Sequence, residues 1–191
     1  GFAELMNQKA QELNLVHTHF VTPHGLDNEN HYTTAYELAL LTDYALKNEK
    51  FKNIVATKTA TISVNGYPRT ISNTNELLGN FEGVYGVKTG FTFNAGRCLV
   101  SSCKRNGMDI IVVVLGADTK NQRTRDSMNV INYVYSTFKY VDIADYIAEG
   151  FTEYKEYYEN HAFLYKTTTK PNIALSSLEN TTFPLKGNSA T

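Results

Sequence analysis

A lysine, a threonine and a glycine stand together at Lys88, Thr89 and Gly90, inside the segment GVYGVKTGFTFNAG, whose remaining residues are typical of a glycine-punctuated strand. The Lys88 ammonium can hold a proton network and an anionic ligand in a dry cleft. The Thr89 hydroxyl can donate to the same anion, and Gly90 leaves room for a peptide backbone to pair with the strand. The alternative is an ordinary surface lysine on an edge strand before a turn.

Length and composition limit the classes of protein to which this segment can belong. The 191 residues suffice for one well-buried domain and part of a second. Hydrophobic residues make up 42% of the chain and charged residues 19%, values typical of soluble globular proteins. A formal net charge of -1, with lysines and arginines dispersed, argues against nucleic acid as a partner.

The first fifteen residues, GFAELMNQKAQELNL, place apolar side chains at helical spacing with a polar opposite face. They lack the basic-then-apolar order of a signal peptide. We therefore expect the chain to start inside a folded element, as a processed or truncated product would.

The elements that must position Lys88 follow from turn residues and periodicity. A capping-box pattern at 34–37 predicts a helix over about 34–47. Asn65-Gly66 predicts a hairpin, and Pro68 keeps its second strand at an edge. Downstream, the patterns predict an antiparallel meander and then a helix, with the strands at 85–91, 97–104 and 108–117 and the helix over 123–138.

Two features of the meander carry further predictions. The run IIVVVLG is apolar without alternation, so both faces of the last strand should be covered. Cys98 and Cys103 lie five residues apart on one strand and should face opposite sides, which argues against a disulfide between them. After residue 140 the composition becomes rich in tyrosine and threonine, and the short runs HAFLYKTTT and NIALSSL predict the start of a mostly β second domain.

Four segments resemble, in order and spacing, the D-alanyl-D-alanine carboxypeptidases, which are low-molecular-weight penicillin-binding proteins of the S11 serine peptidase type. The segments are FVTPHGLDNENHYTTAYELA, NTNELL, GVYGVKTGFTFNAGRCLV and NGMDIIVVVLGADTKNQRTRDS. The resemblance implies an α/β (α+β) fold, a penicillin-binding-protein or β-lactamase-like domain whose antiparallel sheet is flanked by helices. This domain would occupy residues 1–140 and be incomplete at its N-terminus, with part of a small β-rich domain over 141–191.

The resemblance also implies an enzyme of peptidoglycan maturation that removes the terminal D-alanine of a pentapeptide through an acyl-serine intermediate, binds β-lactams and needs no cofactor. Lys88 matches the catalytic lysine of the proton network, and Thr89 and Gly90 match the substrate-binding part of the same motif. The backbone N–H of Phe91 matches an oxyanion donor, and Arg123 matches the arginine that holds the substrate's free carboxylate. The alternative for Arg123 is a solvated charge, unfavourable at a helix start.

The same family uses a nucleophilic serine in an S-x-x-K motif and a second serine in an S-x-N motif, and both lie upstream of the segment that matches residue 1. Four stretches fit these patterns only as text, because they lie on strands, in a turn or at the wrong part of a helix: 101–104, 136–139, 63–65 and 127–129. The chain alone is therefore expected to be inactive.

The upstream segment of the family also supplies strands beside the last strand of the sheet. Without them, the strand at 110–115 would be an open apolar edge, which favours aggregation. We therefore expect a missing N-terminal segment or a second chain to cover it.

Four histidines lie within fifteen positions, and Asp27 and Glu29 lie between them. Neither H-E-x-x-H nor any paired Cys/His spacing is present, so no metal is expected. His24 and His31 are expected to brace the loop beside the cleft instead.

Three function classes stay open. The first is the serine carboxypeptidase, the second a non-catalytic cell-wall-binding relative, and the third and weakest a β-lactamase. A peptidoglycan substrate implies a place in the cell envelope outside the cytoplasmic membrane, with any membrane anchor in segments beyond these residues.

Overall fold

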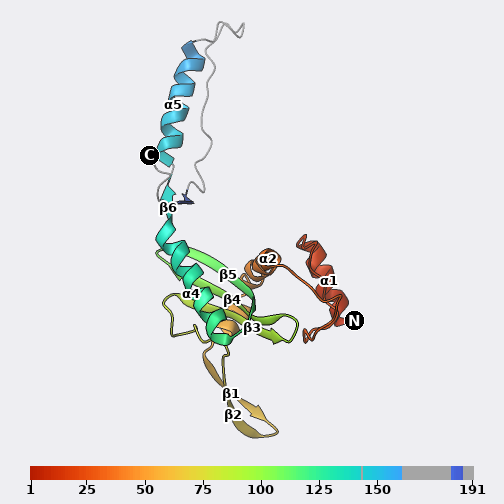
Figure 1. Ribbon diagram of the computed structural model, residues 1–191. Helices are drawn as coiled ribbons and strands as arrows, with labels where there is room; N and C mark the ends of the chain where they lie inside the picture. The colour runs from red at the N-terminus through yellow and green to blue at the C-terminus, as the bar shows by residue number, and fades with distance from the viewer. Residues whose placement is uncertain (143, 161–181, 187–191) are drawn as a thin grey trace. The chain divides into compact units, whose positions relative to one another are not determined.

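The computed structural model describes residues 1–142, 144–160 and 182–186, and the chain divides into two compact units, 1–136 and 137–191. Figure 1 labels the elements of both units. Those that begin in the first unit are α1 (Phe2–Glu12), α2 (Ala35–Leu46), α3 (Glu49–Ala56), β1 (Thr59–Val64), β2 (Tyr67–Ser72), β3 (Val84–Thr92), β4 (Gly96–Arg105), β5 (Met108–Ala117) and α4 (Lys120–Thr137).

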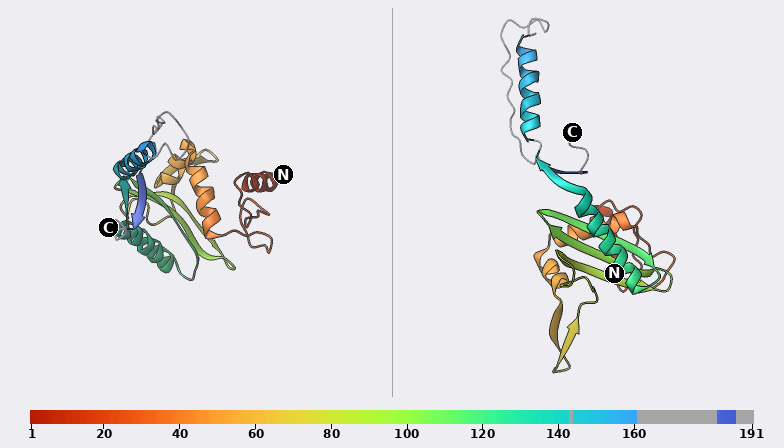
Figure 2. Two further views of the ribbon diagram at one scale, coloured as in Figure 1. Left: turned by 90° about the horizontal axis from the view of Figure 1, so that it is seen from above. Right: turned by 60° about the vertical axis from the view of Figure 1, so that its left-hand side comes forward.

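The first unit is built on an antiparallel sheet of order β3-β4-β5. Helix α4 crosses one face of this sheet, and α2 and α3 lie against the other face (Figures 1 and 2). Asn106 and Gly107 connect β4 to β5 with φ angles of 50° and 80°, which a two-residue hairpin turn requires. The predicted fold class, an antiparallel sheet flanked by helices, is confirmed for this unit.

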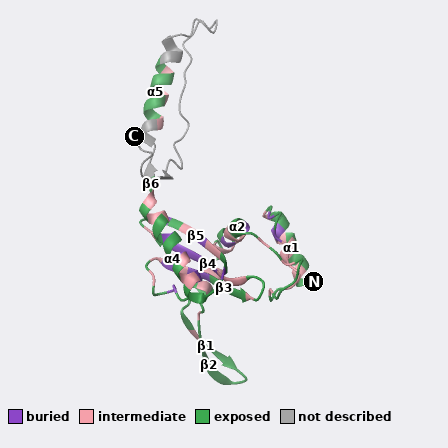
Figure 3. Ribbon diagram, in the orientation of Figure 1, coloured by how far each residue is buried: buried purple, intermediate pink, exposed green. Residues whose placement is uncertain are grey.

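The core lies between the sheet and α4 and contains Leu77, Val84, Leu99, Cys103, Val112 and Ile131. Figure 3 shows the buried residues concentrated on the central strands. The Tyr135 hydroxyl donates to the carbonyl oxygens of Cys103 and Met108 at 2.7 and 3.0 Å. These bonds hold the last turn of α4 against the hairpin that joins β4 to β5.

Strand β5 is less covered than the sequence predicted. Val112 is buried, but Ile110 and Val114 are half-buried, and Leu115 is 39% exposed. The prediction that both faces are covered is wrong for this end of the strand, where Leu115 is exposed. In the part of the chain that the structure describes, no strand pairs with the outer edge of β5.

The local predictions for helix and hairpin are confirmed. The Thr34 hydroxyl caps α2 by accepting the Glu37 backbone N–H at 3.2 Å. Asn65 and Gly66 have φ angles of 53° and 83° and join β1 to β2, which form a separate two-stranded sheet. Helix α4 starts one turn earlier than predicted because the Thr119 hydroxyl accepts the Gln122 backbone N–H at 3.1 Å.

The loop between α1 and α2 is held by the buried carboxylate of Glu37. It accepts hydrogen bonds from the His17 backbone N–H at 2.8 and 3.1 Å and from the Thr18 hydroxyl, and the His17 ring Nδ1 lies 3.1 Å away. Burial by itself raises the pKa of the Glu37 carboxyl, but the bonds from Thr18 and His17 outweigh it, so that this pKa lies below its ordinary value.

Because the folded-state pKa of Glu37 is lowered, the ionised carboxylate stabilises the fold above its unfolded pKa of about 4.5, and this contribution is lost as pH falls through the lower folded pKa. We expect Glu37→Gln to lower the urea midpoint at pH 6 and to narrow the difference between pH 6 and pH 3. Glu29→Gln, at an exposed position in the same loop, should leave both midpoints unchanged. Equal pH dependence in the native chain and Glu37→Gln would contradict this reading.

The second unit contains β6 (Phe138–Asp142), α5 (Ala144–Asn160) and β7 (Thr182–Lys186), and β6 pairs with β7 antiparallel. The helix α5 is a departure from the mostly β composition that the sequence suggested, because the alanine, glutamate and lysine residues in ADYIAEGFTEYKEYYEN favour helix over the β propensity of the tyrosines. The runs HAFLYKTTT and NIALSSL lie outside the described residues. The domain assignment of 1–140 and 141–191 stays a prediction.

Candidate functional site

A pocket of about 570 Å³ lies along β3 and gathers all five residues that the sequence singled out. Its walls come from β3, the start of β4, the start of α4 and the loops before them. The lining residues are His24, Gly25, Leu26, Thr74, Lys88, Thr89, Gly90, Phe91, Thr92, Arg97, Lys120 and Arg123.

Lys88 and Thr89 lie on the middle of β3, which is an edge strand in the order β3-β4-β5. The Lys88 side chain is exposed, and its Nζ donates to the Thr89 carbonyl oxygen at 2.6 Å. The Thr89 hydroxyl lies 2.6 Å from the Thr74 hydroxyl, so one of the two donates to the other. The pocket therefore offers one ammonium and two hydroxyls at the same point of the strand.

The segment NTNELL (73–78) holds this part of β3 in place. The buried Asn75 side chain donates to the Gly86 carbonyl oxygen at 2.9 Å and accepts the Leu77 backbone N–H at 3.1 Å. Its neighbours on either side point to the pocket residues, since Thr74 contacts Thr89 and Glu76 contacts Arg123. The segment thus links β3 to α4 through three consecutive side chains.

Arg123 lies in the first turn of α4 and is only 3% exposed although it lines the pocket. Its Nη2 lies 3.1 Å from the Glu76 carboxylate. The buried Nε of Arg123 has no hydrogen-bond partner in the described part of the chain. Because an unpaired buried donor is costly, this N–H makes Arg123 a candidate binding residue.

Gly90 and Phe91 continue β3 beyond the motif. A Cβ at Gly90 would meet only the Cys98 Cβ, at 3.7 Å, which is an ordinary contact. Phe91 is 47% exposed, and the Arg97 guanidinium carbon lies 3.6 Å from the centre of its ring. Among the described residues no strand pairs with the outer edge of β3.

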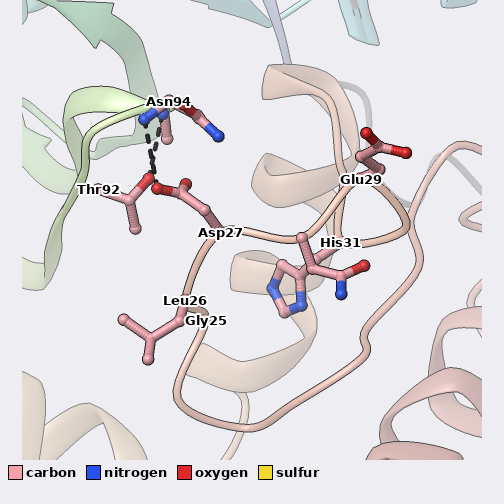
Figure 4. A pocket seen from close by; sticks show the side chains of 9 residues that line it. Gly25, Leu26, Asp27, Glu29, His31, Thr92 and Asn94 are labelled. Atoms are coloured by element: carbon pink, nitrogen blue, oxygen red, sulfur yellow. Dashed lines mark hydrogen bonds between the residues drawn. The ribbon is translucent and has the colours of Figure 1, made fainter.

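A second pocket of about 500 Å³ adjoins the first and shares Gly25, Leu26 and Thr92 with it. Figure 4 shows the Asp27 side chain directed toward Asn94, whose backbone N–H it accepts at 3.4 Å. This bond connects the loop after α1 to the β3–β4 turn.

His24 and His31 brace this loop, as predicted. The His24 Nδ1 accepts the Leu26 backbone N–H at 3.2 Å, and the His31 Nδ1 accepts the Val21 backbone N–H at 3.1 Å. Within residues 1–142, 144–160 and 182–186, no three histidine, cysteine, aspartate or glutamate side chains gather as metal ligands would.

None of the serines that fit the catalytic motifs as text lines the pocket. Ser101, Ser102 and Ser127 are fully buried. Ser63 lies on β1 and Ser136 at the end of α4. The structure thus brings Lys88, Thr89, Gly90, Phe91 and Arg123 together but places no serine beside them among the described residues.

Sequence reasoning missed four residues that belong to the site, namely Thr74, Glu76, Arg97 and Lys120. NTNELL signalled only a resemblance, because its contacts reach residues far along the chain. Arg97 and Lys120 gave no signal, since a single cation at a strand or helix start is ordinary. Cys98 and Cys103 are free thiols, as expected from their spacing.

Comparison with known proteins gives a consistent result. A sequence profile of the D-alanyl-D-alanine carboxypeptidase family, peptidase S11, matches residues 1–119. The D-alanyl-D-alanine carboxypeptidase DacF of Bacillus subtilis is 36% identical over 139 residues, which are 72% of this chain and 36% of the relative. The D-alanyl-D-alanine carboxypeptidase of Streptomyces sp. K15 is 35% identical over 142 residues, which are 71% of this chain and 49% of the relative.

Solved structures agree with the sequences. The Streptomyces K15 DD-transpeptidase superposes with a TM-score of 0.66 at 35% identity, covering 71% of this chain and 54% of that one. Penicillin-binding protein D2 of Listeria monocytogenes, solved in its cefotaxime-bound form, gives a TM-score of 0.62 at 30% identity, covering 69% and 53%. The chain spans about a third to a half of the length of the curated relatives cited here. No helix in the described residues has the length and hydrophobicity to cross a membrane.

Proposed function

The chain belongs to the D-alanyl-D-alanine carboxypeptidase family, and from this we propose that it supplies the carboxylate-binding half of a serine peptidase site. The substrate is a peptidoglycan pentapeptide, from which the complete site removes the terminal D-alanine. The same half site binds β-lactam antibiotics, whose carboxylate takes the place of the peptide's.

One observation carries this proposal: a single pocket brings the Lys88 ammonium, the Thr89 hydroxyl and the Arg123 guanidinium together from two distant segments. A terminal carboxylate is the group that these three donors suit, because it accepts charge-assisted hydrogen bonds from several directions. The buried Nε of Arg123 has no acceptor within the described residues, and a ligand carboxylate would supply one.

Gly90 supports binding of the peptide along β3. The φ angle of Gly90 is not left-handed and a Cβ would fit there, so the fold itself does not demand glycine. A ligand that lies over this face of β3 favours glycine, because a side chain at Gly90 would take up space beside the strand that the ligand needs. On this reading the Phe91 backbone N–H donates to the oxygen of the scissile carbonyl.

The acyl-serine step needs a nucleophile in addition to these residues. A serine Oγ attacks the carbonyl, its proton passes to a base, and the C–N bond to the terminal D-alanine breaks as that amine is protonated. Lys88 holds the proton network electrostatically. We propose that the serine comes from a segment or second chain that also covers β5 over 110–115, whose outer edge has no strand partner in the described residues.

Ser101, Ser102 and Ser127 are fully buried and cannot act as nucleophiles. This favours an alternative function for the chain on its own, that of a module that binds peptidoglycan without cleaving it. Either function requires a place outside the cytoplasmic membrane, where peptidoglycan lies.

Two measurements on the 191-residue chain test the proposal. Acetyl-D-Ala-D-Ala should bind and shift the backbone amide signals of β3 in an NMR titration, and the carboxamide analogue should bind about tenfold more weakly because it lacks the anion. A fluorescent penicillin should leave no covalent label on a denaturing gel. Equal binding of the two peptides would contradict the carboxylate site, and a covalent label would contradict the assignment of the serines.

A further inference from the structure

The hairpin of β1 and β2 projects from the first unit, away from the sheet β3-β4-β5 (Figures 1 and 2). All of its residues over 61–72 are exposed, and Figure 3 shows both strands in the colour of exposed residues. None of them lines the pocket along β3, so the proposed function makes no use of this hairpin. A two-stranded sheet cannot bury either of its faces by itself, and each face therefore meets water or a partner.

The register of the hairpin sorts its side chains into two unlike faces, because residues directly opposite each other in an antiparallel pair project from the same face. One face carries hydroxyl side chains and a proline: Thr59, Thr61, Ser63, Pro68, Thr70 and Ser72. The Thr61 and Thr70 hydroxyls lie 3.2 Å apart on it. The other face carries the pairs Ala60–Ile71, Ile62–Arg69 and Val64–Tyr67. This second face, which we call the apolar face, is therefore hydrophobic around a single cation.

The apolar face continues from the turn of the hairpin to helix α3. Tyr67, next to the turn, is 77% exposed, and Ile62, Val64 and Ile71 are exposed as well. Ile71 shares a pocket of about 260 Å³ with Ile54 of α3, whose side chain is also exposed. Contiguous apolar surface of this kind is unfavourable in water and marks a surface that binds an apolar partner.

Positive charge accompanies the apolar face. Residues 50–75 contain four lysines and arginines and no aspartate or glutamate, although the chain as a whole has a formal net charge of -1. Arg69 lies on the face itself, and Lys58 lines the pocket at its base. Lys50 lies one helical turn before Ile54, on the same side of α3. In the part of the chain that the structure describes, no carboxylate oxygen comes within the 4.0 Å ion-pair distance of these three cations.

We propose that the apolar face of the hairpin binds the surface of a bilayer that contains anionic lipids. Tyr67 and the aliphatic side chains enter the interface, where a tyrosine ring is favoured because it is apolar at one end and hydrated at the other. Arg69 and Lys58 extend their aliphatic stems along the apolar surface and keep their charges at the level of the lipid phosphates.

Other occupants satisfy only half of these features. A polyanion without an apolar part pairs with the cations but leaves Ile62, Val64 and Tyr67 in water. A second copy of the chain stacked on the same face brings further cations against Arg69, which is unfavourable. An anionic bilayer surface complements the apolar side chains and the positive charge together.

Cosedimentation of the 191-residue chain with lipid vesicles, at low and at high ionic strength, tests this inference. Equimolar phosphatidylglycerol and phosphatidylcholine vesicles should bind the chain at least about tenfold more tightly than phosphatidylcholine alone. Tyr67→Ser should weaken binding to the anionic vesicles about five- to tenfold, because it removes apolar area from the interface. Arg69→Gln should weaken it about fivefold, because one cation no longer meets the lipid phosphates.

Tyr36→Ser and Arg125→Gln are the matched controls. Tyr36 lies on α2 and is 72% exposed, close to the value for Tyr67, and Arg125 is exposed on α4. Both variants should bind the anionic vesicles within about twofold of the native chain. Circular dichroism spectra that match the native spectrum show that each of the four variants is folded.

The contrary results are distinct. Equal losses in the control variants and in the hairpin variants overturn the assignment to the hairpin. Equal binding to the two kinds of vesicle, or no binding to either, overturns the anionic bilayer as the partner. Native binding in Tyr67→Ser, with all binding lost at high ionic strength, overturns the membrane contact in favour of a polyanion. Each of these results leaves the proposed function standing, because that function is measured by peptide binding.

Discussion

Replacing Gly83 with alanine is expected to lower the free energy of unfolding by about 2–5 kcal/mol, which combines the cost of a left-handed non-glycine residue with that of overpacking. Gly83 precedes β3 with a φ of 77°, and a Cβ there would lie 2.5 Å from the Lys104 carbonyl oxygen and 2.9 Å from the Arg105 Cγ. The carbonyl cannot move away easily, because β4 is paired on both sides. Urea unfolding followed by circular dichroism measures the difference.

Gly107→Ala is the matched control for this prediction. Gly107 has a φ of 80°, close to that of Gly83, but nothing lies within 4 Å of an added Cβ. This variant should therefore lower the free energy of unfolding only by the cost of a left-handed alanine, about 1–2 kcal/mol. Equal stability of the two variants would contradict the prediction. It would mean that the close approach of Gly83 to the end of β4 adds nothing to the cost of replacing this glycine.

Local signals predicted the elements of the first unit because they are local in origin. The Asn65-Gly66 and Asn106-Gly107 turns need only two residues with left-handed φ, and the cap at Thr34 needs only its own side chain. Lys88, Thr89 and Gly90 drew attention because three chemical types stand next to one another, and the resemblance of the surrounding segments then predicted their roles. For such features, the sequence holds the whole physical cause.

The features that the sequence did not predict depend on distant partners. Arg123 and Glu76 are 47 residues apart, and Arg97 meets Phe91 only when β4 pairs with β3. The exposure of Leu115 depends on which helices pack against β5, and these come from other parts of the chain. For α5, the composition after residue 140 predicted only a mostly β domain and did not predict this helix, because its tyrosines offset its helix formers.

Arg123→Met is expected to weaken binding of acetyl-D-Ala-D-Ala to the 191-residue chain by at least about tenfold, because it removes a charge-assisted donor from a desolvated pocket. Methionine fills much of the volume that the buried side chain occupies, so that the loss of charge dominates the effect. Glu76 is 46% exposed in its side chain and can be rehydrated when its partner is gone. An NMR titration of the β3 amides measures the affinity of native and variant chains.

Two further variants separate carboxylate binding from a purely structural ion pair. Arg125→Met removes an arginine from the same helix whose side chain is 71% exposed and which does not line the pocket, so affinity should be unchanged. Glu76→Gln breaks the ion pair but keeps the guanidinium, and it should bind the peptide at least as well as the native chain, because the competing carboxylate is removed. If Glu76→Gln loses as much affinity as Arg123→Met, then Arg123 acts only by fixing α4 to the NTNELL segment. Retained affinity in Glu76→Gln, together with loss in Arg123→Met, instead means that the guanidinium itself contacts the peptide's terminal carboxylate.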